Sequence, residues 1–371
     1  MIPAEVTEAV RAREPSPAAG PLVAALAAHA AEAAHRAARA SATPPAPRGP
    51  RLPAPAPVVL ADRPDATVVR VGAAVAKAHP ADTDPVALRT RLAVAAHPLL
   101  RGILLPPYPL VGQELLATVQ PSEGVAAGDR AEGAERPAVA GRRPRDGSSG
   151  ARPVSVWPYG HPVDPGDPAA APWEAAAALL ARLHAVPPGR LPGRLPVMRG
   201  PAKAARAMAR LAEIADRDDA AVRTVRRAWR GLPAWARDEA PYEGRSVLCH
   251  GDWHLGQLVR HPAPDGDWLL IDVDDLGVGE PAWDLARPAM WFAAGLLAPE
   301  VWARFLGAYQ AAGGPAAGAG GDPWARLDVP ARTLAVQGAA IAVTKAALGE
   351  RELDEAGAEL LAACARIAQL K

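Results

Sequence analysis

The 371-residue sequence contains little cysteine, few aromatic residues and almost no lysine. Its two cysteines, Cys249 and Cys364, are too few for a cysteine metal cluster or a disulfide framework, so we expect two buried thiols in a reducing compartment. Aromatic residues make up only 4% of the chain, so large side chains that anchor a core are scarce. Half of the residues are nevertheless hydrophobic, which is enough for a sizeable core.

The basic residues are nearly all arginine, and the lysines are Lys77, Lys203, Lys345 and Lys371. Arg, Ala, Pro and Gly all have GC-rich codons, so a GC-rich genome explains most of this bias. A lysine retained against the bias therefore draws attention, although it does not by itself indicate a function.

The sequence also lacks a long apolar segment and an excess of charge of one sign. No segment reaches the roughly 18 uninterrupted apolar residues of a transmembrane helix, and the first residues lack the basic start and apolar run of a signal peptide. The formal net charge is +1, so no overall field attracts nucleic acid or an anionic membrane. We expect a cytoplasmic protein without nucleic-acid or membrane partners. Nothing in the sequence indicates an oligomeric state.

The first part of the chain divides into an extension and a β-rich segment. Residues 1–57 are Ala- and Pro-rich; an Ala-rich helix is predicted at 21–40, and an extended linker follows because Pro can neither continue a helix nor donate to a strand ladder. Residues 58–157 carry short, partly β-branched apolar runs separated by turn formers, which indicate a β-meander followed by one helix and two more strands. The predicted strands are 58–61, 67–71, 74–78, 114–120 and 153–157, and the helix is 85–96. Residues 121–151 are polar, aperiodic and rich in Gly and Pro, and we interpret them as a mobile hairpin insertion.

Residues 158–371 are predicted to be mainly helical. Apolar residues recur at helical spacing after residue 172, and start signals precede them. Further helices are predicted at 202–216, 283–297, 299–312 and 333–348, with a last one near the end of the chain. No internal repeat is present.

The segment SVLCHGDWHLGQLVRHPAPDGDWLLIDVDDLGVGEPAWDLA, residues 246–286, concentrates the residues suited to catalysis. Two apolar strands, 246–248 and 268–271, each deliver a carboxylate at the C-terminal end, Asp252 after the first and Asp272 after the second. We expect these strands to be adjacent and the carboxylates to converge. Magnesium prefers hard oxygen ligands, and an attacking hydroxyl needs a carboxylate to orient it and accept its proton. Both requirements belong to phosphoryl transfer.

This segment resembles the catalytic part of the aminoglycoside phosphotransferase and choline kinase superfamily. HGDWHLGQ is similar to the family's H-G-D-x-H-x-G-N loop and to the protein-kinase loop H-R-D-L-x-x-x-N. LLIDVDDLGVGEPAWDLA is similar to the block I-D-x-x-x-x-G-x-G-x-P-x-x-D-L-A. The resemblance is strong over residues 246–290 and fades toward the N-terminus. It implies an α+β, protein-kinase-like fold with two lobes: a small β-rich N-lobe and a larger, mainly helical C-lobe.

The resemblance also implies roles for individual residues. Asp252 takes the place of the catalytic aspartate, and His254 either hydrogen-bonds the transferred phosphate or orders the loop. Gln257 and Asp272 take the places of the two magnesium ligands, with Gln257 standing where the family has Asn. Asp284 corresponds to an aspartate that holds the catalytic loop through backbone N–H groups. Asp274 and Asp275 are either near the metal or part of a solvated turn, and His250 is interpreted as structural.

The β-rich segment is expected to bind the nucleotide. Lys77 on the third predicted strand resembles the lysine of the protein-kinase V-A-I-K motif, which contacts the α- and β-phosphates. Adenine is expected to pair with backbone groups near Trp157 and Tyr159, where this segment joins the helical part. Two features depart from the kinase pattern: no G-x-G-x-x-G precedes Lys77, and the helix at 85–96 has no Glu to pair with it, which leaves Asp82 and Asp84 as candidates.

The sequence thus predicts an ATP- and Mg²⁺-dependent phosphotransferase that moves a γ-phosphate to a hydroxyl of a small polar molecule. The alternative is a pseudokinase-like module that binds a nucleotide with weak or no catalysis, which Gln257 and the missing helix Glu favour. The acceptor is expected to be neutral or singly charged, because the acidic residues near the C-terminal end are typical of a solvated helix face rather than of a site for a polycation.

Overall fold

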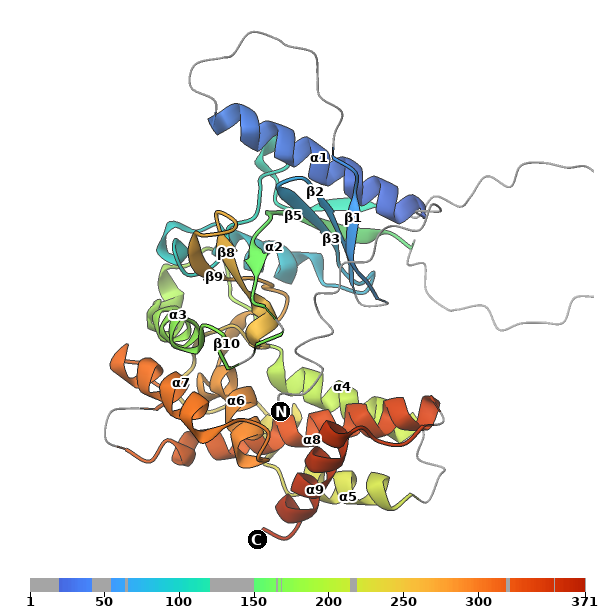
Figure 1. Cartoon of the computed structure of the whole chain (residues 1–371), viewed down its shortest axis with the longest axis vertical. Coiled ribbons are helices and arrows are strands. Elements are labelled where there is room, and N and C mark those ends of the chain that lie inside the picture. Colours follow the sequence, from blue (N-terminus) through green and yellow to red (C-terminus); the bar gives the residue numbers. More distant parts are fainter. Residues whose placement is uncertain are drawn as a thin grey trace, which may run out of the picture. The chain divides into compact units, whose positions relative to one another are not determined.

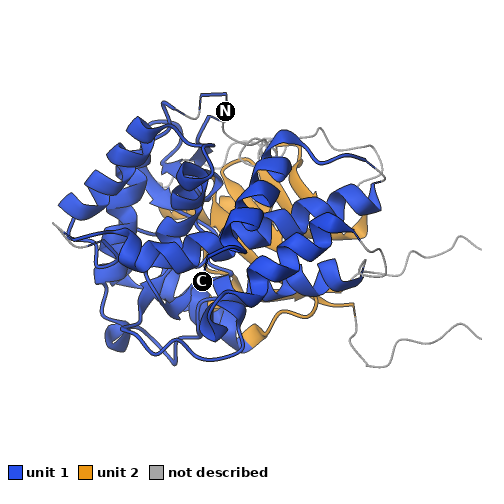
Figure 2. Cartoon of the chain, turned by 90° about the horizontal axis from the view of Figure 1, so that it is seen from below, with its two compact units in different colours: residues 1–11, 86–106, 160–371 blue, residues 12–85, 107–159 orange. Residues whose placement is uncertain are grey.

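The computed structural model describes residues 20–41, 55–63, 66–120, 150–164, 166–167, 169–213, 219–317, 321–349 and 351–370. The chain forms two compact units, shown in different colours in Figure 2. Unit 2 consists of residues 12–85 and 107–159, and unit 1 contains residues 86–106 and 160–371 together with residues 1–11. The predicted insertion at 121–151 lies outside the described residues except for its last two.

Unit 2 is built on a five-stranded antiparallel sheet with the strand order β1-β2-β3-β5-β4. Its strands are β1 (Val58–Arg63), β2 (Ala66–Val71), β3 (Ala74–Ala78), β4 (Ala117–Val119) and β5 (Arg152–Pro158). The predicted meander is therefore present, and β4 is shorter than expected. Burial alternates from residue to residue along β2 and β3, as a sheet with one covered face requires.

Helix α1 (Pro21–Ser41) covers that face, running across the strands in Figure 1. Val23, Leu26, Ala30 and Ala33 follow one another at helical spacing and are buried against the sheet. Because small alanines let the helix approach the strands closely, an Ala-rich sequence suits this position. Residues 21–41, interpreted from sequence as part of an extension, thus belong to the core of unit 2.

Unit 1 is mainly helical, as predicted. The helices are α2 (Pro85–Ala95), α3 (Trp173–Ala185), α4 (Gly200–Glu213), α5 (Ala220–Arg230), α6 (Ala282–Ala293), α7 (Pro299–Ala311), α8 (Trp324–Leu348) and α9 (Glu355–Ile367). The prediction missed α5, whose composition is dominated by arginine, and began α8 nine residues too late because Pro330 lies inside the helix.

Helix α2, predicted in the β-rich lobe, groups with unit 1. The Nε of Arg91 donates to the carbonyl of Leu276 at 2.8 Å, and the backbone N of Leu105 donates to the carbonyl of Leu270 at 2.9 Å. The boundary between the units after Tyr159 lies close to the predicted lobe boundary at residue 157.

Two small sheets lie within unit 1. Strand β7 (Val247–Cys249) pairs with β10 (Gly277–Gly279), and β8 (Leu258–His261) lies between β6 (His161–Pro162) and β9 (Asp267–Leu270). The prediction that the strands before Asp252 and Asp272 are adjacent is therefore wrong. The intervening residues form β8, which takes the pairing edge of β9.

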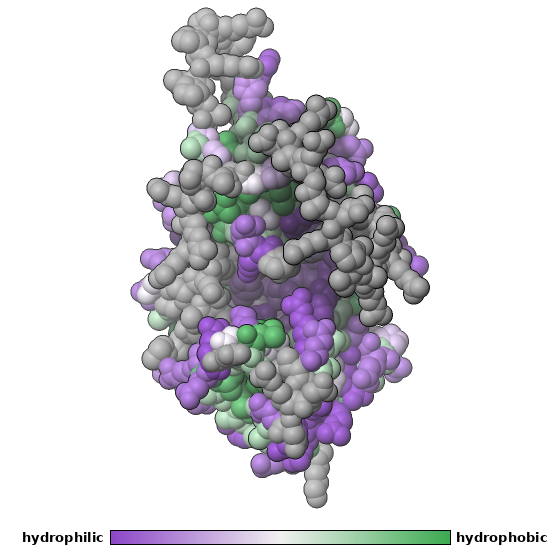
Figure 3. Space-filling model, turned by 90° about the vertical axis from the view of Figure 1, so that its right-hand side faces the viewer, coloured by the Kyte–Doolittle hydropathy of each residue, from purple (hydrophilic) through white to green (hydrophobic). Residues whose placement is uncertain are grey.

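A helix that spans a membrane must be long and apolar. In the described part of the chain, no helix combines the length and apolar character needed to cross a bilayer. On the face shown in Figure 3 the coloured residues are mostly hydrophilic, and hydrophobic ones occur in small patches. Scattered apolar residues of this kind are normal on a protein surface.

Candidate active site

The loop that follows β7 is held by close backbone packing. Gly251 has a φ of +87°, and a Cβ at this position would lie 2.3 Å from the carbonyl oxygen of Asp275. Only glycine fits such a left-handed, crowded position without displacing its neighbour. The loop that carries Asp252 therefore lies directly against the loop that follows Asp272.

Asp284 at the start of α6 holds the same loop through the loop's backbone N–H groups. Its carboxylate accepts hydrogen bonds from the backbone N of His250 at 2.6 Å and of Gly251 at 2.8 Å. It also bonds Nε2 of His184 at 3.0 Å, and Nδ1 of His184 bonds the Tyr309 hydroxyl at 2.8 Å. These contacts are those expected of a residue that supports the loop.

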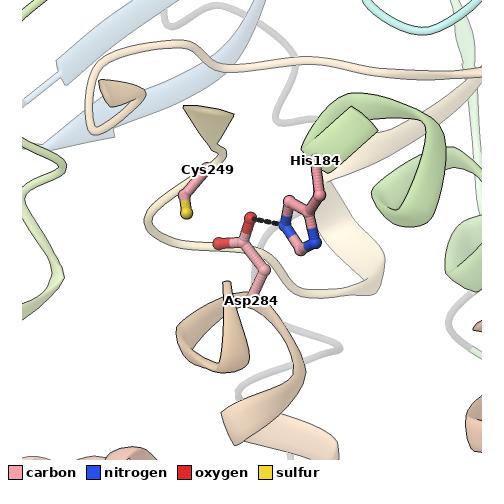
Figure 4. A group of neighbouring side chains, drawn as sticks. All are labelled: His184, Cys249 and Asp284. Carbon is pink, nitrogen blue, oxygen red and sulfur yellow. Dashed lines mark hydrogen bonds and ion pairs between the residues drawn. The ribbon is translucent and has the colours of Figure 1, made fainter. Parts of the chain in front are cut away.

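His184, Asp284 and Cys249 lie close enough for a metal, with ligand atoms within 4.8 Å of one another (Figure 4). Their chemistry argues against one. Both ring nitrogens of His184 already have partners. Burial, together with the nearby charge of Asp284, raises the pKa of the Cys249 thiol well above its ordinary value, so the thiolate that a metal needs is disfavoured. The cluster is a buried support for the loop.

Asp252 follows Gly251 in the loop, and each of its carboxylate oxygens forms an ion pair with a basic side chain. Lys203 from α4 places its Nζ 2.5 Å from Oδ2, and Arg287 from α6 donates from NH2 to Oδ1 at 2.8 Å. Burial alone would raise the pKa of Asp252, but the charges of Lys203 and Arg287 outweigh it and hold that pKa well below its usual range. The carboxylate is therefore ionised at neutral pH.

Lys203 also bridges to a second carboxylate. Its Nζ lies 2.9 Å from Oδ2 of Asp275, whose Oδ1 is 3.5 Å from Nε of Arg199. Burial opposes the charged form of Lys203, but the charges of Asp252 and Asp275 prevail and raise its pKa. Burial also raises the pKa of Asp275, against the opposing charge of Lys203. Asp275 is thus one side of an ion network centred on Lys203.

Trp253, the next residue, anchors the loop in an aromatic cluster. It is 2% exposed, stacks on Phe305 of α7 with 5.2 Å between ring centroids, and meets Trp173 of α3 edge-on at 6.2 Å. Pairs in these geometries stabilise beyond the area they bury. Three of the chain's few aromatic residues therefore gather beside the loop that carries Asp252.

His254 begins the short 3₁₀ turn Leu255–Gln257, and its Nδ1 accepts a hydrogen bond from the backbone N of Gly256 at 3.1 Å. Burial lowers the pKa of His254 to about 4, and the attraction of Asp252 offsets only part of that effect. The ring is therefore neutral at pH 7. Its hydrogen bond orders the loop.

Gln257 at the end of that turn meets Asp272. Nε2 of Gln257 lies 3.5 Å from Oδ2 of Asp272, and the backbone N of Ile271 donates to the carbonyl of Gln257 at 3.0 Å. Nε2 of His250 bonds the carbonyl of Ile271 at 2.8 Å, which ties the two loops together. Asp272 has a φ of +63°, a conformation that Asp tolerates better than most residues. The two residues expected to bind a metal are therefore neighbours in the structure.

The nucleotide-binding candidates belong to unit 2. Lys77 lies on β3 opposite Val68 and Ser155 of the flanking strands. Trp157 on β5 is opposite Val75, and its Nε1 donates to the Ser155 hydroxyl at 2.9 Å.

Tyr159 follows β5, and its backbone N donates to the carbonyl of Ala73 at 2.8 Å. The Arg70 guanidinium lies 3.5 Å above the Tyr159 ring. The backbone N of Tyr159 is thus used within the unit. The carbonyl of Val156 points away from β3 and accepts a hydrogen bond from the backbone N of Tyr108.

Comparisons with known proteins identify the family. The sequence profile of the phosphotransferase enzyme family matches residues 129–328, more than half of the chain. The chain belongs to this family. The expected resemblance to the aminoglycoside phosphotransferase and choline kinase superfamily is thereby confirmed, and so is the protein-kinase-like α+β fold. No curated protein sequence gives a significant match.

Two solved structures of other phosphotransferases share the fold at low sequence identity. A thermostable mutant of aminoglycoside phosphotransferase APH(4)-Ia is 13% identical with a TM-score of 0.52, over 85% of this chain and 94% of that one. The amicoumacin kinase hAmiN, solved with AMP-PNP and Ca²⁺, is 11% identical with a TM-score of 0.50, over 84% and 87%. A choline/ethanolamine kinase family protein from Mesorhizobium loti is 14% identical with a TM-score of 0.45, over 82% and 86%.

Sequence reasoning missed the two cations beside Asp252. Lys203 is 49 residues from Asp252 along the chain and belongs to no motif, and Arg287 directly follows the D-L-A residues of the family block. The scarcity of lysine was the one signal for Lys203, because every other basic residue of α4 is arginine. Arg287 gave no signal among the many arginines of the chain.

Proposed function

We propose that this member of the phosphotransferase enzyme family transfers the γ-phosphoryl group of ATP to a hydroxyl of a small polar molecule. The observation that carries the proposal is the meeting of two loops, one with Asp252 and Gln257 and the other with Asp272. Asp284 supports the first loop through that loop's backbone N–H groups, and His250 ties this loop to the second through the carbonyl of Ile271. A base and two oxygen-bearing side chains at one place are what phosphoryl transfer requires. ATP-dependent chemistry agrees with the expected cytoplasmic location.

Gln257 from the first loop and Asp272 from the second suit magnesium. Asp272 offers a carboxylate and Gln257 an amide oxygen, both hard donors, and their side chains are 3.5 Å apart. Nε2 of Gln257 now faces Asp272, so the amide has to turn over for its oxygen to reach a shared cation. A magnesium ion held by these residues would neutralise charge on the phosphates as it builds up during transfer.

In the proposed reaction Asp252 orients the acceptor hydroxyl. The hydroxyl oxygen forms a bond to the γ-phosphorus while the bond from that phosphorus to the β–γ bridging oxygen breaks, and its electron pair leaves with ADP. The proton of the hydroxyl passes to Asp252 and then to solvent. Because the pKa of Asp252 is held low by Lys203 and Arg287, positioning contributes more than basicity.

Unit 2 supplies the proposed nucleotide contacts. Lys77 would bind the α- and β-phosphates, and Trp157 and Tyr159 mark the segment beside the adenine. The N–H of Tyr159 points toward Ala73, whereas the carbonyl of Val156 points to the opposite side of the chain, toward Tyr108. Backbone groups of residues two apart in an extended chain point the same way. The carbonyl of Pro158 therefore points in the same direction as that of Val156. We therefore propose Pro158, rather than Tyr159, as the acceptor for the adenine amino group.

The test is a phosphorylation screen with ATP and magnesium across sugars, amino alcohols, hydroxy acids and antibiotics, read as acceptor-dependent ADP release and by ³¹P NMR of the product. Asp252→Asn should abolish the signal, whereas Asp238→Asn, a change at an exposed aspartate, should leave it unchanged. Nucleotide binding without turnover on any acceptor would instead support the pseudokinase-like alternative.

A further inference from the structure

The surroundings of Asp252 contain more positive than negative charge. Three cationic side chains, those of Arg199, Lys203 and Arg287, meet two carboxylates, those of Asp252 and Asp275. Among the described residues, His254, whose ring is neutral at pH 7, is the one other ionisable side chain that interacts with Asp252. Among these five side chains, positive charges therefore exceed negative charges by one.

The side chains around Asp252 also offer more hydrogen-bond donors than the carboxylates can accept. Both oxygens of Asp252 are engaged. Lys203 uses two of the three N–H donors of an ammonium group, one on Asp252 and one on Asp275. The Nε of Arg287 is buried and has no hydrogen-bond partner among the described residues. Spare donors beside an already occupied carboxylate are suited to an additional anion.

The side chains that carry these groups are partly exposed, although the Nε atom of Arg287 itself is buried. The side chains of Lys203, Arg287 and Asp252 are 28%, 21% and 20% exposed, so none is sealed in the core. All three come from unit 1, from α4, α6 and the loop after β7. A small molecule can therefore contact the base and its cations together.

We propose that the acceptor carries an anionic group, a carboxylate or a phosphate, near its reactive hydroxyl, and that Lys203, assisted by Arg287, binds it and determines specificity. This inference rests on the proposed phosphotransferase function. The acceptor anion takes Lys203 away from Oδ2 of Asp252, and the freed oxygen accepts the acceptor's hydroxyl hydrogen bond. A cationic acceptor cannot replace Asp252 as the partner of Lys203 and is repelled by both Lys203 and Arg287.

A purely structural role for Lys203 makes a different prediction. If the lysine only held Asp252 in place, its loss would slow transfer to every acceptor by the same factor. If it binds the acceptor anion, its loss removes the preference for anionic acceptors over neutral ones. The ratio between two matched acceptors therefore separates the two roles.

The first experiment needs no turnover. Protein labelled with ¹³Cε-lysine has one signal for each of four lysines, and Lys203→Gln identifies the signal of Lys203. Sodium acetate should shift that signal in a saturable manner, whereas acetamide and an equal concentration of sodium chloride should not, and the signal of exposed Lys345 should stay in place. An acetate effect absent at Lys203, or equal at all lysines, would overturn the proposal even if the protein proved to be an active kinase.

The second experiment compares acceptors matched in size: a hydroxy acid, its neutral amide and the corresponding amino alcohol. We expect kcat/KM to favour the hydroxy acid over its amide by about tenfold or more, the value of one charge-assisted hydrogen bond. Lys203→Gln should bring this ratio close to one, and Lys345→Gln should leave it intact. Equal efficiency on acid and amide, or a ratio unchanged in Lys203→Gln, would refute the role of Lys203. Absence of transfer to all acceptors would refute the proposed function, while the acetate titration still decides the anion site.

Discussion

At the scale of single residues, the site is governed by charges that constrain one another. Asp252 is kept ionised by Lys203 and Arg287, and Lys203 is kept protonated by Asp252 and Asp275. Removing one member of such a group leaves the others partly buried without a partner, which costs far more than an exposed ion pair contributes. Substitutions here therefore need controls for folding as well as for catalysis.

Asp252→Asn should remove phosphoryl transfer. Asparagine keeps the shape of the side chain but neither attracts the hydroxyl proton nor neutralises Lys203 and Arg287, so we expect a fall in kcat of about 10²–10⁴, the usual contribution of a positioned acid or base. Nucleotide affinity, measured by calorimetry, should change little. Turnover near that of the wild type would contradict the role of Asp252.

Asp272→Ala should weaken magnesium-dependent nucleotide binding much more than binding without metal, because the carboxylate acts through the cation. Alanine at a positive φ also strains the backbone. Asp238→Ala is a matched control, since Asp238 has a φ of +61° against +63° for Asp272 and lies on the surface. Equal losses with and without magnesium, measured by calorimetry, would count against a ligand role for Asp272.

His254 should make the protein sensitive to mild acid. Its pKa is about 4 in the folded protein and 6.5 when unperturbed, so as the pH falls the unfolded chain binds a proton before the folded one does. The free energy of unfolding should therefore fall between pH 6.5 and about 4, by on the order of 1–3 kcal/mol, and be independent of this group above that range.

The variant His254→Asn isolates this effect, because asparagine can still accept the hydrogen bond from Gly256 but does not titrate. Urea unfolding of both proteins from pH 4 to 7 should give a difference in unfolding free energy that shrinks toward low pH. A constant difference would show that His254 titrates normally in the folded state.

At the scale of elements, most of the fold follows from local patterns, and the exceptions have physical causes. Alternating burial in β2 and β3 and helical periodicity in α3 were visible in the sequence. The pairing of β7 with β10, rather than with the strand before Asp272, was not visible, because β7 and β10 are distant in the sequence and pairing between distant segments leaves no local trace. The Asp252–Arg287 ion pair was invisible for the same reason, since 35 residues separate its partners.

Helix α1 shows how a segment without a motif acquires a structural role. Leu26 is fully buried against the sheet of unit 2, whereas Leu22 is only partly buried. Leu26→Ala should therefore lower the local stability of unit 2 by about 2–4 kcal/mol through lost burial and a cavity, and Leu22→Ala by less. Hydrogen exchange at the amides of β2 and β3 measures the effect. Unchanged exchange in Leu26→Ala would mean that α1 does not stabilise the sheet.

At the scale of the whole molecule, the net charge says nothing about the substrate, whereas the charges around Asp252 do. A net charge of +1 arises from 41 basic and 40 acidic residues, so no overall field selects a substrate. Basic side chains nevertheless surround Asp252, while the acidic residues near the C-terminal end lie elsewhere in the fold. Asp354 caps α9 by accepting a hydrogen bond from the backbone N of Gly357 at 2.8 Å, and Glu355 and Glu359 are exposed.

This distribution predicts that classical aminoglycosides are poor acceptors. A polycation needs a carboxylate for each ammonium group that loses its hydration, and at Asp252 it would instead meet Lys203 and Arg287. We expect kcat/KM for kanamycin to lie well below about 10⁴ M⁻¹s⁻¹, the lower end of typical enzyme efficiency. The acceptors that are phosphorylated best in the same screen provide the reference. A kanamycin value at or above that level would show this prediction wrong.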